Sequence, residues 1–145
     1  MSARTTLLVA SVVATSSLGV LPNVSMGQGQ PQTNVIYKSA TTSAGEPLVF
    51  PTQNVEVTGS IGVRPPGWVG EWHKHPYPRI HYILEGTFTV EYENGETKNF
   101  PAGSLSVEPV NVWHRPKNVG NVAAKWLFVD AAESGKPNVT PQAKP

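Results

Sequence analysis

The sequence contains no cysteine and few charged residues, only 14% of the 145. Without cysteine no disulfide can form, so stability must come from a hydrophobic core, with a bound metal as a further source. The formal net charge is +1, and basic residues are scattered among acidic ones instead of gathering on one face. Nucleic acid is therefore excluded as a partner, because binding it requires a basic surface that neutralises phosphates.

Helical periodicity is also missing, since no segment of a dozen residues shows it beyond the N-terminal apolar run. Glycine (13) and proline (14) are frequent, which favours short strands joined by turns. Asn94-Gly95 predicts a hairpin with a type I′ turn, in which both residues take positive φ. The sequence thus predicts one all-β domain, a sandwich or a barrel. The predicted strands are 35–37, 48–50, 54–64, 79–85, 87–93, 96–100, 104–108 and 122–131.

No apolar run is long enough to cross a bilayer stably, which needs ~20 residues. The longest, Leu7 to Leu21, follows Arg4 and precedes small residues, so residues 1–27 are predicted to be a cleaved signal peptide; a membrane anchor is the alternative. We expect a flexible leader at 28–34, a folded domain at 35–132 and a flexible tail at 133–145. The protein is then expected in the periplasm or secreted.

The four histidines are the main chemical feature. His73 and His75 are two positions apart, so on a strand they project from the same face, and Glu71 shares their parity. Such a pair also occurs on solvated strands, but His114 in a second apolar segment favours a metal site. Imidazole ligates Fe, Mn, Zn, Ni and Cu, so the type of divalent transition metal stays open.

Two spaced motifs resemble those of the cupin superfamily, G(X)5HXH(X)3E(X)6G and G(X)5PXG(X)2H(X)3N. The matching residues are Gly67, His73, His75 and Gly86 for the first motif, and Gly103, Pro109, His114 and Asn118 for the second. The resemblance implies a double-stranded β-helix, or jelly-roll, that forms a cupin barrel over residues 35–132. It also implies that His73, His75 and His114 are metal ligands.

The sequence departs from the first motif at Arg79, which stands in the place of the ligand glutamate and cannot ligate a metal. His81, two positions on and on the same strand face, is a candidate fourth ligand, and so is Glu71; a core imidazole is the alternative for His81. Four interpretations of Arg79 stay open: it pairs with Glu71, it binds an anionic substrate, it lies in a metal-free pocket that binds an acid, or it points to solvent. Asn111 replaces a motif glycine, which is milder because asparagine tolerates the left-handed conformation.

The resemblance implies a metal-dependent enzyme of the dioxygenase, isomerase or lyase type, acting on a small oxygenated or carboxylate substrate. Glu71 and Arg79 are then the catalytic candidates, with Arg79 orienting an anionic group. Glu71 and Glu108 are the carboxylates near the histidines in sequence, and the sequence does not determine which way Glu108 faces. A non-catalytic module that binds a small molecule or metal is the competing interpretation, and a structural protein is a third. Edge strands of small cupins often pair between chains, so a homodimer is left open.

Overall fold

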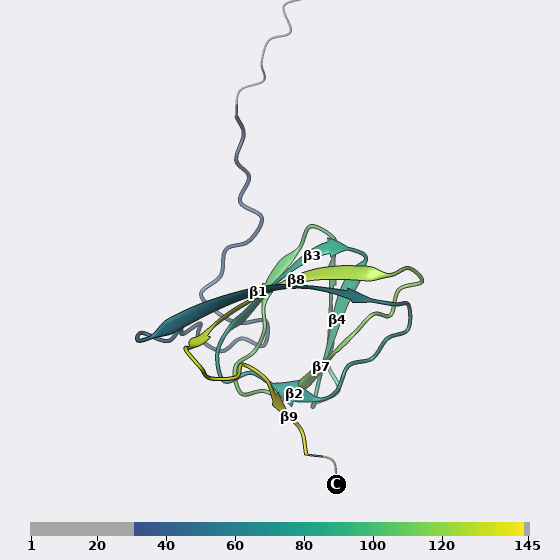
Figure 1. The fold of residues 1–145 in the computed structure, drawn as a ribbon. Helices are drawn as coiled ribbons and strands as arrows, with labels where there is room; N and C mark the ends of the chain where they lie inside the picture. The colour runs from purple at the N-terminus through teal and green to yellow at the C-terminus, as the bar shows by residue number, and fades with distance from the viewer. Residues whose placement is uncertain (1–30, 144–145) are drawn as a thin grey trace, which may run out of the picture. The chain divides into compact units, whose positions relative to one another are not determined.

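Nine β-strands form the part of the chain that the computed structural model describes, residues 31–143 (Figure 1). The predicted signal peptide, and residues 28–30 of the predicted leader, lie outside these residues. The β domain falls within the unit from Thr33 onward and is described by itself. Among the described residues there is no helix with the length and apolar character needed to cross a membrane.

The strands form two antiparallel sheets, which confirms the all-β prediction. One sheet has the order β1-β8-β3-β6 and the other β5-β4-β7-β2-β9. Strands distant in sequence are neighbours in both, so the sheets close over a common interior (Figure 1). The strands are β1 Val55–Arg64, β2 His73–Lys74, β3 Arg79–Glu85, β4 Thr87–Tyr92, β5 Thr97–Pro101, β6 Leu105–Val107, β7 His114–Lys117, β8 Ala124–Glu133 and β9 Thr140–Pro141.

Alternation along β3, β4 and β8 directs every second side chain into the interior. Phe88, Val90 and Tyr92 of β4 are buried, and Trp126 of β8 and Ile83 of β3 complete the core with Ala124. Full burial of such side chains contributes about 1.5–3 kcal/mol each. This apolar core lies beside the histidines, since the ring of His81 packs edge-on against Phe88 with centroids 4.5 Å apart.

Some local predictions were wrong. Residues 35–37 and 48–50 are not strands. The Asn94-Gly95 hairpin forms, but its turn is not type I′, because Gly95 has φ 85° while Asn94 is not in the positive region. The Asn94 side-chain oxygen instead accepts the backbone N–H of Glu96 (2.9 Å), an Asx-type bond that asparagine favours. Asn111 has φ 60°, which confirms that it can replace the motif glycine.

The C-terminal segment 133–145, expected to be a flexible tail, makes specific contacts in its described part. Strand β9 pairs with β2 through Thr140 and Pro141. Asn138 is buried, with 8% of its surface exposed, and its side-chain oxygen accepts the backbone N–H of Tyr77 at 3.0 Å. This segment therefore borders the strand that carries His73.

Gly86, between β3 and β4, provides a test of the fold. Its φ is +72°, and an added Cβ would lie 2.9 Å from both the Cα and the Cβ of Ala124. Gly86→Ala should therefore lower the free energy of unfolding by roughly 2–4 kcal/mol, from left-handed strain and overpacking together. Urea denaturation of the wild type and the variant measures this difference.

Gly59→Ala is the matched control, because Gly59 lies in a continuous β1–β8 register and an added Cβ would meet nothing within 4 Å. Its effect should stay within about 0.5 kcal/mol. Equal effects of the two substitutions would contradict the close approach of Gly86 to Ala124.

Candidate metal centre

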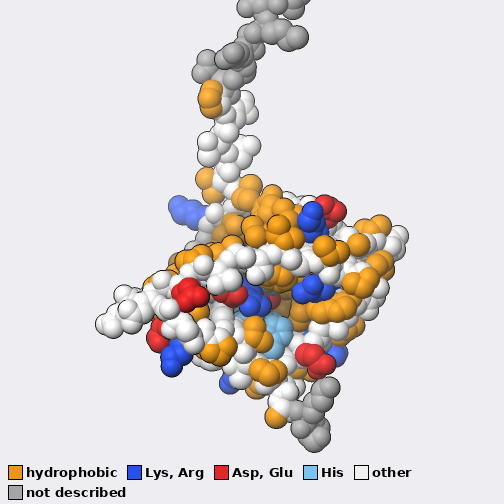
Figure 2. All heavy atoms as spheres, in the orientation of Figure 1, with side chains coloured by type: hydrophobic (Ala, Val, Ile, Leu, Met, Phe, Trp, Pro, Cys, Tyr) orange, Lys and Arg blue, Asp and Glu red, His pale blue; other side chains and the backbone are white. Residues whose placement is uncertain are grey.

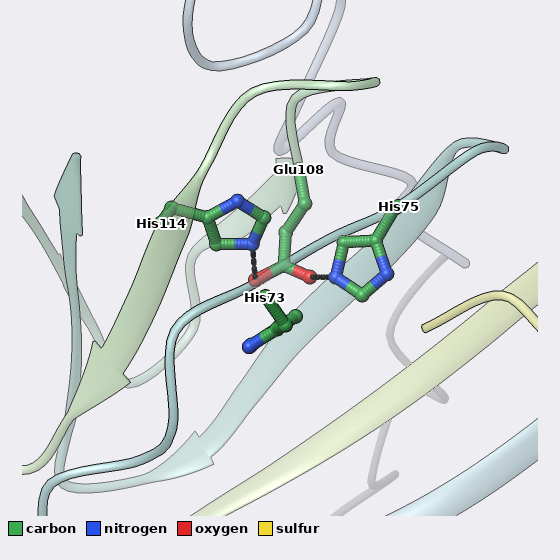
Figure 3. A group of neighbouring side chains, drawn as sticks. All are labelled: His73, His75, Glu108 and His114. Atoms are coloured by element: carbon green, nitrogen blue, oxygen red, sulfur yellow. Dashed lines mark ion pairs between the residues drawn. The ribbon is translucent and has the colours of Figure 1, made fainter. Parts of the chain in front are cut away.

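Three histidines meet at one end of the second sheet, and strand pairing brings them together. His73 in β2 is the Cα partner of His114 in β7. His75 follows directly after β2, where an isolated bridge joins it to Val110. The ring centroids are 4.9 Å apart for His73 and His75, 4.7 Å for His73 and His114, and 5.1 Å for His75 and His114. The imidazoles thus form a triangle (Figure 3).

Each of these imidazoles has its Nδ1 against a backbone carbonyl oxygen. The acceptors are the carbonyls of Glu71 for His73 (2.8 Å), Val112 for His114 (2.8 Å) and Asn138 for His75. A carbonyl only accepts, so each Nδ1 carries the proton and donates it. In the neutral ring the lone pair is then on Nε2, and this tautomer is the one that second-sphere hydrogen bonds select in metal-ligating histidines.

Glu108 supplies a carboxylate to the same point. It is 2% exposed, and its oxygens lie 2.8 Å from the Nε2 of His75 and 3.6 Å from the Nε2 of His114. One ligand atom from each of His73, His75, Glu108 and His114 falls within 4.8 Å of the others. Figure 3 shows the carboxylate directed between the imidazoles. Four donor atoms thus converge on one point.

The backbone explains how Glu108 replaces the missing motif glutamate. The N–H of Glu108 donates to the carbonyl of Arg79 at 2.8 Å, so the two residues are neighbours on adjacent chain segments. The carboxylate therefore comes from the segment beside β3 instead of from β3 itself. Sequence reasoning did not identify it, because its inward direction depends on the pairing of two strands. Ser106 pairs with the inward-facing His81, and Glu108, two residues on, shares the parity of Ser106.

Burial alone would keep Glu108 protonated, because desolvation raises the pKa of a carboxyl group. When the rings are protonated, the charges of His81 and His75 and the hydrogen bonds of His114 and His75 outweigh this, and the pKa of Glu108 then lies well below the usual value. Burial likewise lowers the pKa of His114, but the hydrogen bond and charge of Glu108 outweigh it and the net shift is upward. Both shifts arise because the carboxylate and a protonated imidazole in contact with it stabilise each other's charged forms; when the rings are neutral, only a bound cation can supply the positive charge.

The buried donor atoms also lack hydrogen-bond partners. Among the described residues, the Nε2 atoms of His75 and His114 and the Oε2 of Glu108 are inaccessible and make no hydrogen bond of good geometry. Lone pairs of neutral imidazoles facing a carboxylate repel one another unless a proton or a cation lies between them. Three imidazole nitrogens and one carboxylate are a donor set that suits divalent transition metals. The residues present therefore fit a metal ion.

His81 lies beside this group but not in it. Its Nδ1 is 3.5 Å from Oε1 of Glu108, and its ring lies between Phe88 and Phe128 with centroids 4.5 and 4.6 Å away. Neither of its ring nitrogens has a hydrogen-bond partner among the described residues. Burial lowers its pKa to about 4, so the ring is neutral at neutral pH.

Arg79 is paired with Asp130. Its Nε and Nη2 donate to the two carboxylate oxygens of Asp130 at 2.7 and 2.8 Å, and its side chain is 16% exposed. Asp130 also accepts a hydrogen bond from the side-chain amide of Asn138. The backbone carbonyl of Asn138 in turn accepts a hydrogen bond from Nδ1 of His75. The guanidinium of Arg79 is therefore linked through Asp130 and Asn138 to His75, one of the four residues of the candidate metal group (His73, His75, Glu108 and His114). Its charge is offset by the carboxylate of Asp130.

A cavity of about 280 Å³ opens beside the histidines. Figure 2 shows histidine side chains in a hollow of the visible face, bordered by cationic and anionic side chains. Glu71, His73, Arg79, His81 and Glu108 all line it, so every sequence-predicted site residue except His75 and His114 reaches this space. The remaining walls are Ser60, Arg64, Trp68, Gly70, Pro116, Trp126, Phe128, Asp130, Val139 and Pro141.

The low pKa of His81 makes stability depend on pH. The unfolded chain binds a proton on this histidine near pH 6.5 and the folded chain only near pH 4. The stability that the neutral buried ring contributes is therefore complete above pH 6.5 and is lost as the pH falls towards 4. Between pH 7 and pH 5 the loss from His81 is about 2 kcal/mol.

The substitution His81→Leu should remove the part of the pH-dependent loss of stability that His81 causes. In metal-free protein, urea denaturation at both pH values should show a loss of stability on acidification that is smaller than in the wild type by about 2 kcal/mol. An unchanged loss would mean that His81 is protonated in the folded protein or is exposed.

Comparison with known proteins gives the fold a family. A family model described as a cupin domain matches residues 61–130. A search of curated proteins finds no match to the sequence. Among solved structures, an uncharacterized Klebsiella pneumoniae protein with a double-stranded β-helix domain is 19% identical with TM-score 0.51, over 68% of this chain and 83% of that one.

Two further similar structures are enzymes. A chain from the crystal structures of the DMSP lyases RdDddP and RnDddQII is 18% identical with TM-score 0.51, and the match covers 63% of this chain and 46% of that one. The Lactobacillus farciminis oxalate decarboxylase, in a formate complex, is 26% identical with TM-score 0.50, over 59% of this chain and 26% of that one. This chain thus spans less than half of each enzyme chain.

The two antiparallel sheets, the spaced histidine motifs and the family match agree with one another, and the double-stranded β-helix prediction is confirmed. Residues 61–130 of the chain form a domain of the cupin superfamily.

Proposed function

We propose that this cupin binds one divalent transition metal through the Nε2 atoms of His73, His75 and His114 and the carboxylate of Glu108. The observation that carries the proposal is the set of three Nδ1–H···O=C hydrogen bonds, which leave three Nε2 lone pairs facing one buried carboxylate. Neutral rings in this tautomer cannot donate to Glu108. A proton on His114 would satisfy one contact of the carboxylate, whereas a metal ion is shared by all four donor atoms.

The proposed activity is a metal-dependent reaction of the lyase, isomerase or dioxygenase type on a small oxygenated compound in the adjoining cavity. A metal ion in such a site supplies Lewis-acid chemistry to an oxygen atom of the substrate. The oxalate decarboxylase that resembles this chain was solved with formate, and this supports a small oxygenated substrate. Turnover distinguishes this proposal from a non-catalytic binding module.

The protein's own side chains would then have separate tasks. His81 reaches the cavity wall as a neutral imidazole whose ring nitrogens have no partner among the described residues, so it can form a hydrogen bond with a substrate there. Arg79 is a positioning residue, because its fork is occupied by Asp130 and its influence passes through Asn138 to His75. Glu71 lines the cavity and holds His73 through its backbone carbonyl.

Two glutamates that line the same cavity test the ligand set. Glu108→Gln should weaken metal affinity at least roughly tenfold, because the variant loses the anionic ligand of the group. Glu71→Gln should leave affinity nearly unchanged, because the side chain of Glu71 is outside the four-residue group. Elemental analysis of untagged protein, dialysed against a weak chelator, measures the retained metal.

The opposite pattern, with metal lost in Glu71→Gln and kept in Glu108→Gln, would make Glu71 the carboxylate ligand. If the wild type retains no more metal than the double variant His73→Ala/His75→Ala, the metal proposal fails altogether.

We also propose that the protein is exported, on the pattern of residues 1–27. The mature N-terminus is then expected near Gln28. N-terminal sequencing of protein from the periplasmic or secreted fraction tests this, and an intact Met1 on exported protein would contradict cleavage.

A further inference from the structure

We propose that the cavity takes a small carboxylate with a flat apolar body, and that Arg64 binds the carboxylate group. The inference rests on the proposed function in one respect, since it names the ligand class for the cavity beside the metal group. Arg64 is a different residue from Arg79, which the sequence pattern predicts to orient an anionic group of the substrate.

The two arginines that line the cavity differ in what they bind. Arg79 has its Nε–Nη2 edge filled by the two oxygens of Asp130. Within residues 31–143, Arg64 donates through Nη1 alone, to the carbonyl of Val63 at 3.1 Å. Its Nε is buried without a hydrogen-bond acceptor, and within the described residues it pairs with no carboxylate. The buried Nε cannot itself reach a ligand, but Arg64 lines the cavity and Nη2 makes no hydrogen bond within the described residues, so the outer N–H groups of the guanidinium are suited to an acceptor brought by a ligand.

Aromatic rings hold the Arg64 guanidinium in place. Its central carbon lies 4.7 Å from the ring centroid of Trp68, 5.7 Å from Trp126 and 5.8 Å from Phe128. Stacking on ring faces leaves the planar edge of the guanidinium available for bidentate hydrogen bonds. Because the side chain is already ordered, binding loses little conformational entropy.

Gly62 leaves room for this arrangement. A Cβ at Gly62 would lie 2.8 Å from Nη1 of Arg64 and 2.8 Å from the ring of Phe128. The guanidinium therefore lies back over the end of β1, against the cavity wall, and not out in solvent. The absent side chain at Gly62 is what allows the cation to lie there.

The other walls determine the rest of the ligand. Trp68, Trp126, Phe128, Pro116 and Val139 give the cavity flat apolar sides. Its polar end is formed by His73 and Glu108 of the metal group. At about 280 Å³ the cavity is at the small end of ligand sites. A ligand with a carboxylate at Arg64 and an apolar body along the rings matches this division.

Charge favours an anion over a neutral molecule. Arg79 and Asp130 neutralise each other, Glu108 belongs to the proposed metal group, and Glu71 has an interaction partner of its own. In the described part of the chain, Arg64 is then the cation of the cavity with which no carboxylate forms an ion pair. A carboxylate forms charge-assisted hydrogen bonds with such a fork, and a neutral amide of the same shape does not.

Benzoate, with benzamide as its neutral isostere, is a suitable pair of probes. Isothermal titration of the metal-loaded full chain should show that benzoate binds and that benzamide binds at least roughly tenfold more weakly. Arg64→Gln should weaken benzoate binding roughly 10- to 100-fold while leaving metal content and benzamide binding unchanged.

Arg115→Gln is the matched control. Arg115 also stacks over a tryptophan, Trp72, at 4.8 Å, but it pairs with Glu91 and does not line the cavity. The Arg115→Gln variant should bind benzoate with the same affinity as the wild type. If Arg64→Gln fails to fold, Arg64→Lys keeps the charge but not the fork, and should bind benzoate more weakly than the wild type.

Three results would overturn the inference: no benzoate binding, equal binding of benzoate and benzamide, or unchanged benzoate binding in Arg64→Gln and Arg64→Lys. Loss of benzoate binding on metal removal, with no effect of Arg64→Gln, would place the carboxylate on the metal instead. Arg64-dependent binding in a protein that holds no metal would support the inference and contradict the proposed function, so the two can fail separately.

Discussion

The ionised carboxylate of Glu108, buried among imidazole nitrogens, is the interaction on which the rest of the site depends. Removing such an ion from water costs several kcal/mol, and this cost must be offset by opposite charge and hydrogen bonds. His75 lies 2.8 Å away, and His81 and His114 lie at 3.5 and 3.6 Å. Their rings are held by backbone carbonyls or by aromatic packing, so the groups around the carboxylate are ordered before any ligand arrives.

The supporting structure extends well beyond the ligand atoms. Arg79 holds Asp130, Asp130 accepts a hydrogen bond from Asn138, and the Asn138 carbonyl orients His75. Asn138 belongs to the C-terminal segment, and β9 of that segment pairs with β2. The arginine that replaces the motif glutamate is thus part of a structure that positions a histidine. Its charge is neutralised by Asp130, a carboxylate outside the group of His73, His75, Glu108 and His114.

Much of the fold was predictable, because alternation in β1, β3, β4 and β8 and two spaced motifs are local signals. The strand that carries His73 was expected, but the short strands β7 and β9 were not, because prolines and polar residues interrupt them and only pairing with distant strands makes them regular. The meeting of His73, His75 and His114 followed from the motifs. The inward direction of Glu108 and the pairing of Arg79 with Asp130 depend on contacts between segments that no local pattern encodes.

The central claim is that three Nε2 atoms and Glu108 hold one metal ion, and an anomalous difference map tests it most directly. Crystals grown with Zn²⁺ and measured on both sides of its absorption edge should show a peak bonded to His73, His75, His114 and Glu108. Crystals that bind Zn²⁺ elsewhere but show no peak among these four side chains would contradict the account.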